Sequence, residues 1–373
     1  MRIHTVRADE KLSDIAARYG TDEESVAGYN GIKGDRVCVG EQLLLLIPTR
    51  TYTPRAVEST ESVALRFGVK AEELRRNNPC ALEGVTPKHM TVKYSPHPYG
   101  SAAANGYIYR GYDKQRLKEV LPFLTYLTVV GAELKDDGIR GLFDTAEALS
   151  RAREARAVRI AKLVDKRTDK KSFDTATERI IEFAKRDGYD GVALEINANE
   201  GDIDEIAAFL VRLRGAMIGN DLILITELHG EGAYQLADYA DGCVFPTDEG
   251  EDIGLLRERL RRFAEDSESI KTFVELPSFA SSPEGYLPID EAVGRLRAEM
   301  ARANTDAKTL LTEFECKGTG RIVYPSLSYI KAVLDDVNEY GYMGISFDAT
   351  RMPLQFLHAY ASLFKPLKGL GNH

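Results

Sequence analysis

The sequence predicts an α/β fold: a (β/α)8 barrel of the TIM type, preceded by two small strand–helix–helix–strand (βααβ) units. Three observations predict this. The first part of the chain repeats one pattern twice, with a period of about fifty residues. From residue 106 onward, short apolar runs alternate with amphipathic helical segments, as in parallel sheets with crossover helices. The 373 residues, 43% hydrophobic and 29% charged, suit a globular protein of more than one domain.

The first unit is predicted over residues 1–48. Leu12, Ile15 and Tyr19 recur at helical spacing, and Gly20 follows where a helix would end in a left-handed residue. A second helical segment leads to Asn30, and a final apolar strand closes the unit. The order strand, helix, helix, strand follows from these signals.

The second unit is predicted over residues 50–97. Gly68 stands at the same helix end as in the first unit, Asn78 at the same place after the second helix, and Met90–Val92 forms the closing strand. The pattern repeats, but the loop after the first strand differs between the two copies.

Both units resemble the LysM family, in which an N-acetylated glycan lies between the loop after the first strand and the loop after the second helix. The resemblance therefore implies a groove in each unit. An alternative for Asn30 and Asn78 is that they only shape turns. The residues of this chain that match the glycan-contacting loops are Asp9, Glu10, Leu12, Asn30, Gly31, Asn78 and Pro79.

A linker is predicted over residues 98–105 because the stretch is rich in small and polar residues, and the barrel is predicted over residues 106–373. Segments 175–186 and 203–217 are predicted as two of its helices. The eight predicted strands are 106–109, 127–130, 158–161, 191–194, 222–225, 242–245, 272–274 and 344–347.

The fourth strand carries a motif. Gly188–Asn197 is similar to the signature DGxDxDxE of the family 18 glycoside hydrolases, and further segments follow LysM-linked members of that family in spore-forming bacteria. In that family the final Glu protonates the glycosidic oxygen, the Asp before it orients the substrate's acetamido group, and a Tyr after the sixth strand assists. The positions of the three signature acids are here Ala193, Glu195 and Asn197.

The matching site is degenerate. An amide has no proton to give at working pH, so Asn197 cannot replace the acid. The Tyr position falls near Thr247, beside a retained Asp248, and the aromatic floor falls near Phe347, in a chain without Trp. We therefore expect a barrel with little or no hydrolysis of the family type.

Carboxylates remain abundant near predicted strand ends. If several converge, burial and like charges would raise a pKa, and Glu195 could act as a relocated acid. The alternative is that they form solvated rims or structural contacts. The residues expected to line a substrate site in the barrel are Tyr107, Glu133, Glu227, Glu275, Phe347 and Asp348.

The composition indicates which classes of ligand the protein can bind. A net charge of −9 argues against a phosphate backbone, so an N-acetylglucosamine-containing polysaccharide is expected and nucleic acid is not. The six histidines and four cysteines lack metal-ligand spacing, so neither metal nor cofactor is expected, and the cysteines are expected to be buried.

No apolar run is long enough to cross a bilayer, and the N-terminus lacks a signal-peptide pattern, so cytoplasmic synthesis without membrane insertion is expected. The family resemblance implies deposition at a spore coat, cortex or cell wall. Three functions stay open: a glycan-binding protein with a degenerate barrel, an active N-acetylglucosaminidase, and a spore-coat scaffold that binds other coat proteins.

Overall fold

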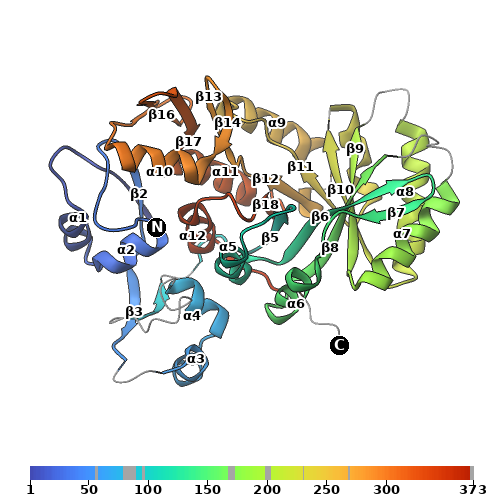
Figure 1. Ribbon diagram of the computed structural model, residues 1–373, viewed down its shortest axis with the longest axis horizontal. Coiled ribbons are helices and arrows are strands. Elements are labelled where there is room, and N and C mark those ends of the chain that lie inside the picture. Colours follow the sequence, from blue (N-terminus) through green and yellow to red (C-terminus); the bar gives the residue numbers. More distant parts are fainter. Residues whose placement is uncertain are drawn as a thin grey trace.

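Figure 1 shows the computed structural model, in which the blue N-terminal units lie at one end of a barrel. The residues that the structure describes are 1–54, 58–78, 90–94, 97–166, 173–197, 203–229, 231–267 and 269–369.

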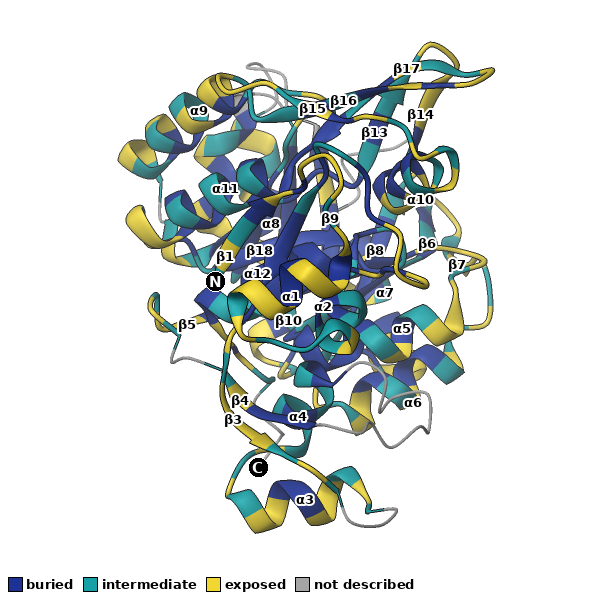
Figure 2. Cartoon of the chain, turned by 90° about the vertical axis from the view of Figure 1, so that its left-hand side faces the viewer, coloured by how far each residue is buried: buried dark blue, intermediate teal, exposed yellow. Residues whose placement is uncertain are grey.

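The first N-terminal unit has the predicted order. It consists of β1 (Arg2–Thr5), α1 (Leu12–Tyr19), α2 (Glu23–Tyr29) and β2 (Gln42–Leu45), with β1 and β2 antiparallel. Gly20 ends α1 with a φ of 69°, and the Asp22 side chain accepts the amide of Ser25 at the start of α2. Both helices bury one side and expose the other, as Figure 2 shows.

The second unit repeats this order with β3 (Pro48–Tyr52), α3 (Thr60–Phe67), α4 (Ala71–Asn77) and β4 (Met90–Tyr94). Gly68 again ends a helix, with a φ of 66°. Its fully buried apolar residues form a small core of their own: Val63, Ala64, Leu74 and Met90.

The eight predicted barrel strands are confirmed. They are parallel, and β5 pairs with both β18 and β6, which closes the sheet into a barrel. The strands are β5 (Ser101–Ile108), β6 (Tyr126–Lys135), β8 (Val158–Asp165), β9 (Gly191–Asn197), β10 (Ile223–His229), β11 (Gly242–Phe245), β12 (Thr272–Glu275) and β18 (Gly344–Asp348).

The predicted linker is wrong in its second half, because residues 101–105 belong to β5. β5 and β18 approach closely at this point, since a Cβ on Gly344 would lie 1.9 Å from the carbonyl oxygen of Ala103. The stretch was predicted as a linker because it is rich in small and polar residues, although most of it is a tightly packed strand.

Helices surround the barrel, and the two that were predicted by range are confirmed as α7 and α8. Two short strands, β7 (Gly138–Gly141) and β19 (Lys365–Pro366), extend the sheet. The helices are α5 (Lys114–Val120), α6 (Ala146–Glu154), α7 (Phe173–Asp187), α8 (Ile203–Ile218), α9 (Ile253–Asp266), α11 (Leu327–Glu339), α12 (Leu354–Leu363) and the 3-10 helices η2 (Leu121–Phe123), η4 (Glu231–Tyr239) and η5 (Ser269–Lys271).

An antiparallel sheet that the sequence did not predict is inserted between β12 and β18. Its strands lie in the order β14-β13-β17-β16-β15, and a helix packs on it. The elements are β13 (Phe279–Ser282), β14 (Gly285–Pro288), α10 (Ile289–Glu299), β15 (Asn304–Thr305), β16 (Leu311–Cys316) and β17 (Gly320–Pro325).

The first N-terminal unit is fixed to this insertion and to the barrel helix α11. The Ala303 amide donates to the Val39 carbonyl at 2.9 Å, and the Gln42 side chain accepts from the amide and hydroxyl of Ser328. Leu43, like other buried residues of the unit, belongs to the same continuous core as the barrel helices. The unit and the barrel therefore form one packed body.

Of the cysteines, Cys38, Cys243 and Cys316 are buried and free, as expected, whereas Cys80 lies outside the described residues. Within the described chain, no helix is long and apolar enough to cross a membrane.

Gly40 tests the contact between the first unit and the insertion. Gly34 and Gly40 have nearly the same left-handed φ, 88° and 86°, but only a Cβ at Gly40 would collide with the Ala303 carbonyl oxygen, at 1.9 Å. We expect Gly34→Ala to cost about 1 kcal/mol through backbone strain, and Gly40→Ala to cost clearly more and to make the 1–48 segment sensitive to protease. Thermal unfolding and limited proteolysis check this; equal effects of the two substitutions would contradict it.

Candidate functional site

The interior of the barrel is filled in layers. An apolar layer contains Ala103, Ile160, Ala193, Ile225, Val244 and Phe273. Above it, the Thr128 hydroxyl donates to Asn105 Oδ1 at 2.7 Å, and Asn105 Nδ2 donates to the Ser346 hydroxyl at 3.1 Å. Because side chains on a strand alternate between its two faces, the next inward residue on each strand lies at the carboxyl-terminal mouth.

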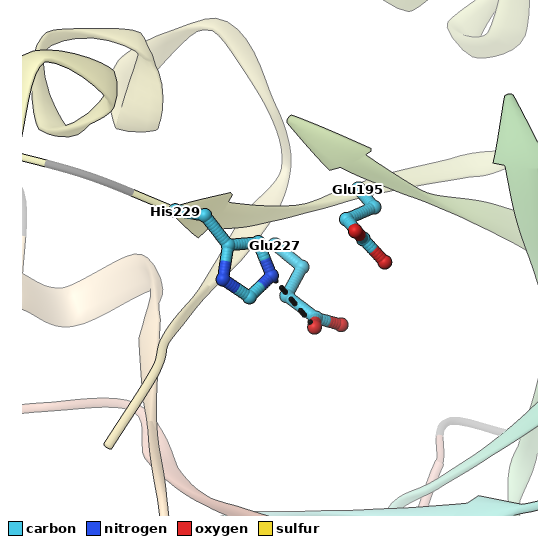
Figure 3. Close-up of side chains that lie close together, drawn as sticks. All are labelled: Glu195, Glu227 and His229. Atoms are coloured by element: carbon cyan, nitrogen blue, oxygen red, sulfur yellow. Dashed lines mark hydrogen bonds and ion pairs between the residues drawn. The ribbon is translucent and has the colours of Figure 1, made fainter. Parts of the chain in front are cut away.

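Lys162 lies at the centre of that mouth. Its ammonium is 2.5 Å from Glu227 Oε2 and 3.5 Å from Glu195 Oε2, and its side chain is only 8% exposed. Tyr107, on β5, donates its hydroxyl to Glu227 Oε2 at 3.1 Å. Figure 3 shows Glu195 and Glu227 on adjacent strands, with His229 two residues beyond Glu227 on the same strand.

Glu227 is held ionised. Burial acts to raise its pKa, but the hydrogen bond from His229 at 3.1 Å and the charge and hydrogen bond of Lys162 outweigh burial and lower the pKa to about 2. The same hydrogen bond to Glu227 raises the pKa of His229. Glu227 is thus a carboxylate under any ordinary condition.

Glu275 is in the opposite state. Desolvation and then the charge of Glu227 raise its pKa to about 8, so that it is a neutral acid at pH 7. Glu249, in the loop after β11, behaves similarly: burial raises its pKa to about 7, although it accepts the Phe279 amide at 3.2 Å. Near the mouth, Glu227 is therefore ionised, whereas Glu275 and Glu249 can hold a proton.

Asp348, at the end of β18, is 5% exposed and accepts the amide and hydroxyl of Thr350 at 2.9 and 3.0 Å. Arg351 lies 3.3 Å from its other oxygen and stacks on Tyr109 and Phe279, with 5.7 and 5.2 Å from the guanidinium carbon to the ring centres. Its carboxylate is thus already bonded within the loop that follows β18.

The predicted position of Phe347 in the substrate site is wrong. Phe347 is fully buried on the outer side of β18, in the core beneath the helices, because Ser346 and Asp348 occupy the inward positions. The Asp248 side chain is 84% exposed and lies 3.3 Å from Arg259 on α9, so it forms a solvent-exposed ion pair, and its catalytic role stays a prediction.

Glu133 and Asn197 lie near the carboxyl ends of their strands. Glu133 pairs with Lys135 of its own strand at 3.0 Å and lies opposite Arg140 of β7, at the edge of the sheet. Asn197 is the last residue of β9, and its backbone aligns with His229 of β10.

A metal was not expected, yet the ligand atoms of Glu195, Glu227 and His229 all lie within 4.8 Å of one another. The donor set is one that a divalent ion could use. However, the ammonium of Lys162 already contacts both carboxylates and supplies the positive charge that an ion would bring. The geometry thus fits an ion pair better than a metal centre.

In the first N-terminal unit, Asn30 and Leu12 cannot contact a glycan directly, which corrects two predicted contacts. Leu12 is fully buried in the core, and the Asn30 side chain is bonded inside the unit. Asn30 Nδ2 donates to the carbonyls of Val26 and Leu44 at 2.8 and 2.9 Å, and its oxygen accepts the Leu44 amide at 2.8 Å. The turn-forming alternative is correct for Asn30.

Asn78 has the same role in the second unit. It bonds the carbonyls of Leu74 and Thr91 and accepts the Thr91 amide at 2.8 Å, so its predicted glycan contact is also wrong. Pro79, beside it, lies outside the described residues.

Glu10 is bonded within the first unit, whereas Asp9 and Gly31 are exposed. Although desolvation acts to raise the pKa of Glu10, hydrogen bonds from the Arg7 amide, Arg18 and His4 lower it to about 2. Asp9 and Gly31 both have positive φ, 64° and 62°. These two exposed loop residues are the surviving glycan-contact candidates.

The comparisons with known proteins identify the first unit. Residues 4–45 match the LysM domain family. This segment is a LysM domain. A curated protein of Bacillus subtilis (strain 168), named "Putative sporulation-specific glycosylase YdhD", is 22% identical over 246 residues, which are 60% of this chain and 57% of that protein. The chain thus spans little more than half the length of that relative.

Solved structures share the whole architecture. The spore cortex-lytic enzymes SleL of Bacillus megaterium QM B1551 and Bacillus cereus superpose with TM-scores of 0.76 and 0.75 over 99% of both chains, at 17% and 16% identity. A GH18 chitinase of Cycas revoluta in complex with (GlcNAc)3 covers 70% of this chain and 99% of its own, with a TM-score of 0.59 and 14% identity. At these identities the likeness establishes the fold.

Sequence reasoning missed Lys162 and Glu249, and treated His229 as a structural residue. Lys162 had a signal: it is a charged residue inside the apolar run Val158–Val164, in register with the inward Ile160. Glu249 follows a strand by four residues and carries no comparable signal.

Asn30 allows a test of its structural role. Asn30→Ala would remove three side-chain hydrogen bonds and leave the amide and the carbonyl of Leu44 without the partner that Asn30 provides, and we expect it to lower the free energy of unfolding by about 2–4 kcal/mol. Asp9→Asn is the matched control, because Asp9 is exposed and Asn tolerates its positive φ; it should leave stability unchanged. Thermal unfolding measures both. An Asn30→Ala protein of normal stability would refute the structural role.

Glu275 makes stability depend on pH. Its folded pKa of about 8 exceeds the ordinary value of 4.5, so its contribution to stability is fully present below pH 4.5 and is lost as pH rises to 8. The side chain in Glu275→Gln stays neutral at every pH. The free energy of unfolding of this variant relative to the wild type should therefore rise between pH 4.5 and 8, by a few kcal/mol at most. Denaturant unfolding at several pH values tests this, with exposed Glu284→Gln as the control; parallel profiles would contradict it.

Proposed function

We propose that this protein binds N-acetylglucosamine-containing polysaccharide and that its barrel does not hydrolyse glycan by the family 18 mechanism. The observation that carries the second part is the end of β9: Asn197 occupies the position of the acid, and the neighbouring Glu195 is drawn into an ion pair with Lys162. An amide and a charge-paired carboxylate are both poor proton donors.

Several features support a polysaccharide of this kind as the ligand. Residues 4–45 form a LysM domain, and this family holds N-acetylated glycan between two of its loops. The second unit repeats the same strand–helix–helix–strand order. We infer that the second unit is a further LysM-type module. SleL-like architecture and the sporulation-related relative make peptidoglycan of the spore cortex or cell wall the proposed polymer, and the spore coat or cortex the proposed location.

The test is to incubate the pure chain with chitin and with cortex peptidoglycan, and to follow retention on each polymer and the masses of soluble products. We expect retention without new products, and the double variant Asp9→Ala with Gly31→Trp should weaken retention because both positions are exposed in the predicted groove. New products with N-acetylglucosamine ends would overturn the non-hydrolytic assignment.

One observation favours hydrolysis as a second candidate function. The environments of Glu227 and Glu275 push their pKa values apart, to about 2 and about 8, which is the pattern of a charged stabilising carboxylate beside a proton donor. In that case the relocated acid is Glu275, and not Glu195 as the sequence suggested, since Lys162 pairs with Glu195.

If products do appear, Glu275→Gln should lower the rate by about 10²–10⁴-fold, the usual contribution of a general acid, while retention on the polymer stays normal. Asp248→Asn is the control, because that carboxylate lies on the surface and pairs with Arg259. A Glu275→Gln protein with full turnover would exclude Glu275 as the acid.

A further inference from the structure

A second cleft lies outside the barrel mouth, between the LysM domain and the barrel. It has a volume of about 1350 Å³. One wall is formed by α2 and the loop 30–36 of the LysM domain, and the other by α5, α10 and the start of α12, which gather around α2 in Figures 1 and 2. Gly31, one of the two glycan-contact candidates, also lies on the LysM wall, so the cleft adjoins the predicted glycan groove.

The two walls are held together by Arg297 of α10. Its guanidinium donates to Glu41 at 2.8 Å and to the backbone carbonyls of Gly31 and Asn30 at 2.9 and 3.1 Å. Glu41 is 2% exposed, so the ion pair is shielded from solvent. The cleft is therefore preformed, and a ligand would not have to bring its walls together.

Two buried polar atoms that line the cleft have no partner. The side-chain oxygen of Gln355, a residue that is 5% exposed, accepts no hydrogen bond, and Nε of Arg116 donates none. Unsatisfied buried groups are costly and rare, so each calls for a partner that arrives with a ligand or with water. A secondary amide carries both groups that are needed: an N–H for Gln355 and a carbonyl oxygen for Arg116.

The cleft also carries charges of both signs on both walls. Lys33 and Glu23 belong to the LysM wall, and Arg116 and Asp290 to the barrel wall. An uncharged sugar chain can offer such groups hydrogen bonds only, whereas a peptide with free carboxylates and an amino group also pairs with both signs of charge. The chemistry thus favours a short zwitterionic peptide over a bare glycan.

The cleft and the barrel mouth share the loop that follows β18. Thr350 lines the cleft, and the same Thr350 donates its amide and hydroxyl to Asp348 at the end of β18.

We propose that this cleft binds the stem peptide that peptidoglycan carries on its glycan strand, with a peptide amide between Gln355 and Arg116 and the charged groups of the peptide on the two walls. This inference rests on the proposed function and deepens it, because it selects peptide-bearing peptidoglycan over chitin as the polymer.

Titration calorimetry on the full chain tests the inference with two probes: an N-acetylglucosamine–N-acetylmuramic acid disaccharide that carries its peptide, and the same disaccharide without it. We expect the peptide to tighten binding by about tenfold or more. Gln355→Leu and Arg36→Ala should remove most of that gain; Arg36 is an exposed residue of the LysM wall, so its variant is expected to fold normally. Lys118→Ala, on the exposed side of α5 outside the cleft, is the control and should keep the gain.

The outcomes separate the two ideas. Equal affinity for the two probes would overturn the stem-peptide site and leave glycan binding intact. A peptide gain that survives both Gln355→Leu and Arg36→Ala would overturn the assignment to this cleft. Failure to bind either probe, or chitin, would contradict the proposed function together with the inference.

Discussion

The buried ion pair between Lys162 and Glu227 is the interaction around which the polar groups of the barrel mouth are arranged. An ammonium group with 8% exposure is tolerated only if it is paired and hydrogen-bonded, and Glu227 provides that partner. Tyr107 and His229 complete the shell of Glu227. Burial is the main cause of the raised pKa of Glu275, and the negative charge that remains on Glu227 adds to it. His229 and Lys162 therefore keep Glu227 ionised, whereas burial keeps Glu275 protonated.

The barrel could be predicted from the sequence because buried parallel strands form apolar runs that a reader can count. Its first strand could not be bounded in this way, since Ala102–Ala104 has the composition of a linker and becomes a strand only through close packing with β18. The inserted sheet was missed for another reason. Its strands are short and half exposed, as in Gly320–Pro325, and are defined by pairing partners that lie far away in the chain.

At the site, the sequence located the strand ends but not the direction of each side chain. Glu227, Glu275 and Tyr107 do converge at the mouth, because their strands end at the same edge of the barrel. Phe347 was assigned to the wrong face, since a shift of one residue reverses the side of the sheet. Asn30 was predicted to contact glycan because it lies in the loop after the second helix. The sequence does not distinguish an Asn that bonds the backbone there from one that binds a ligand.

The two N-terminal units differ in how they are anchored, and this has a consequence for glycan capture. The LysM domain shares the barrel's core, so its loops keep a fixed orientation relative to the mouth. If the LysM loops and the mouth bind the same glycan strand, no conformational entropy of a flexible linker is lost. Among the described residues of the second unit, Val63, Ala64, Leu74 and Met90 form a small core that packs separately, and Arg76 donates to the Pro122 carbonyl of the barrel at 3.0 Å. Capture by the first unit would therefore set the direction in which a glycan strand runs across the protein, whereas a contact made by the second unit would depend on this smaller, separate core.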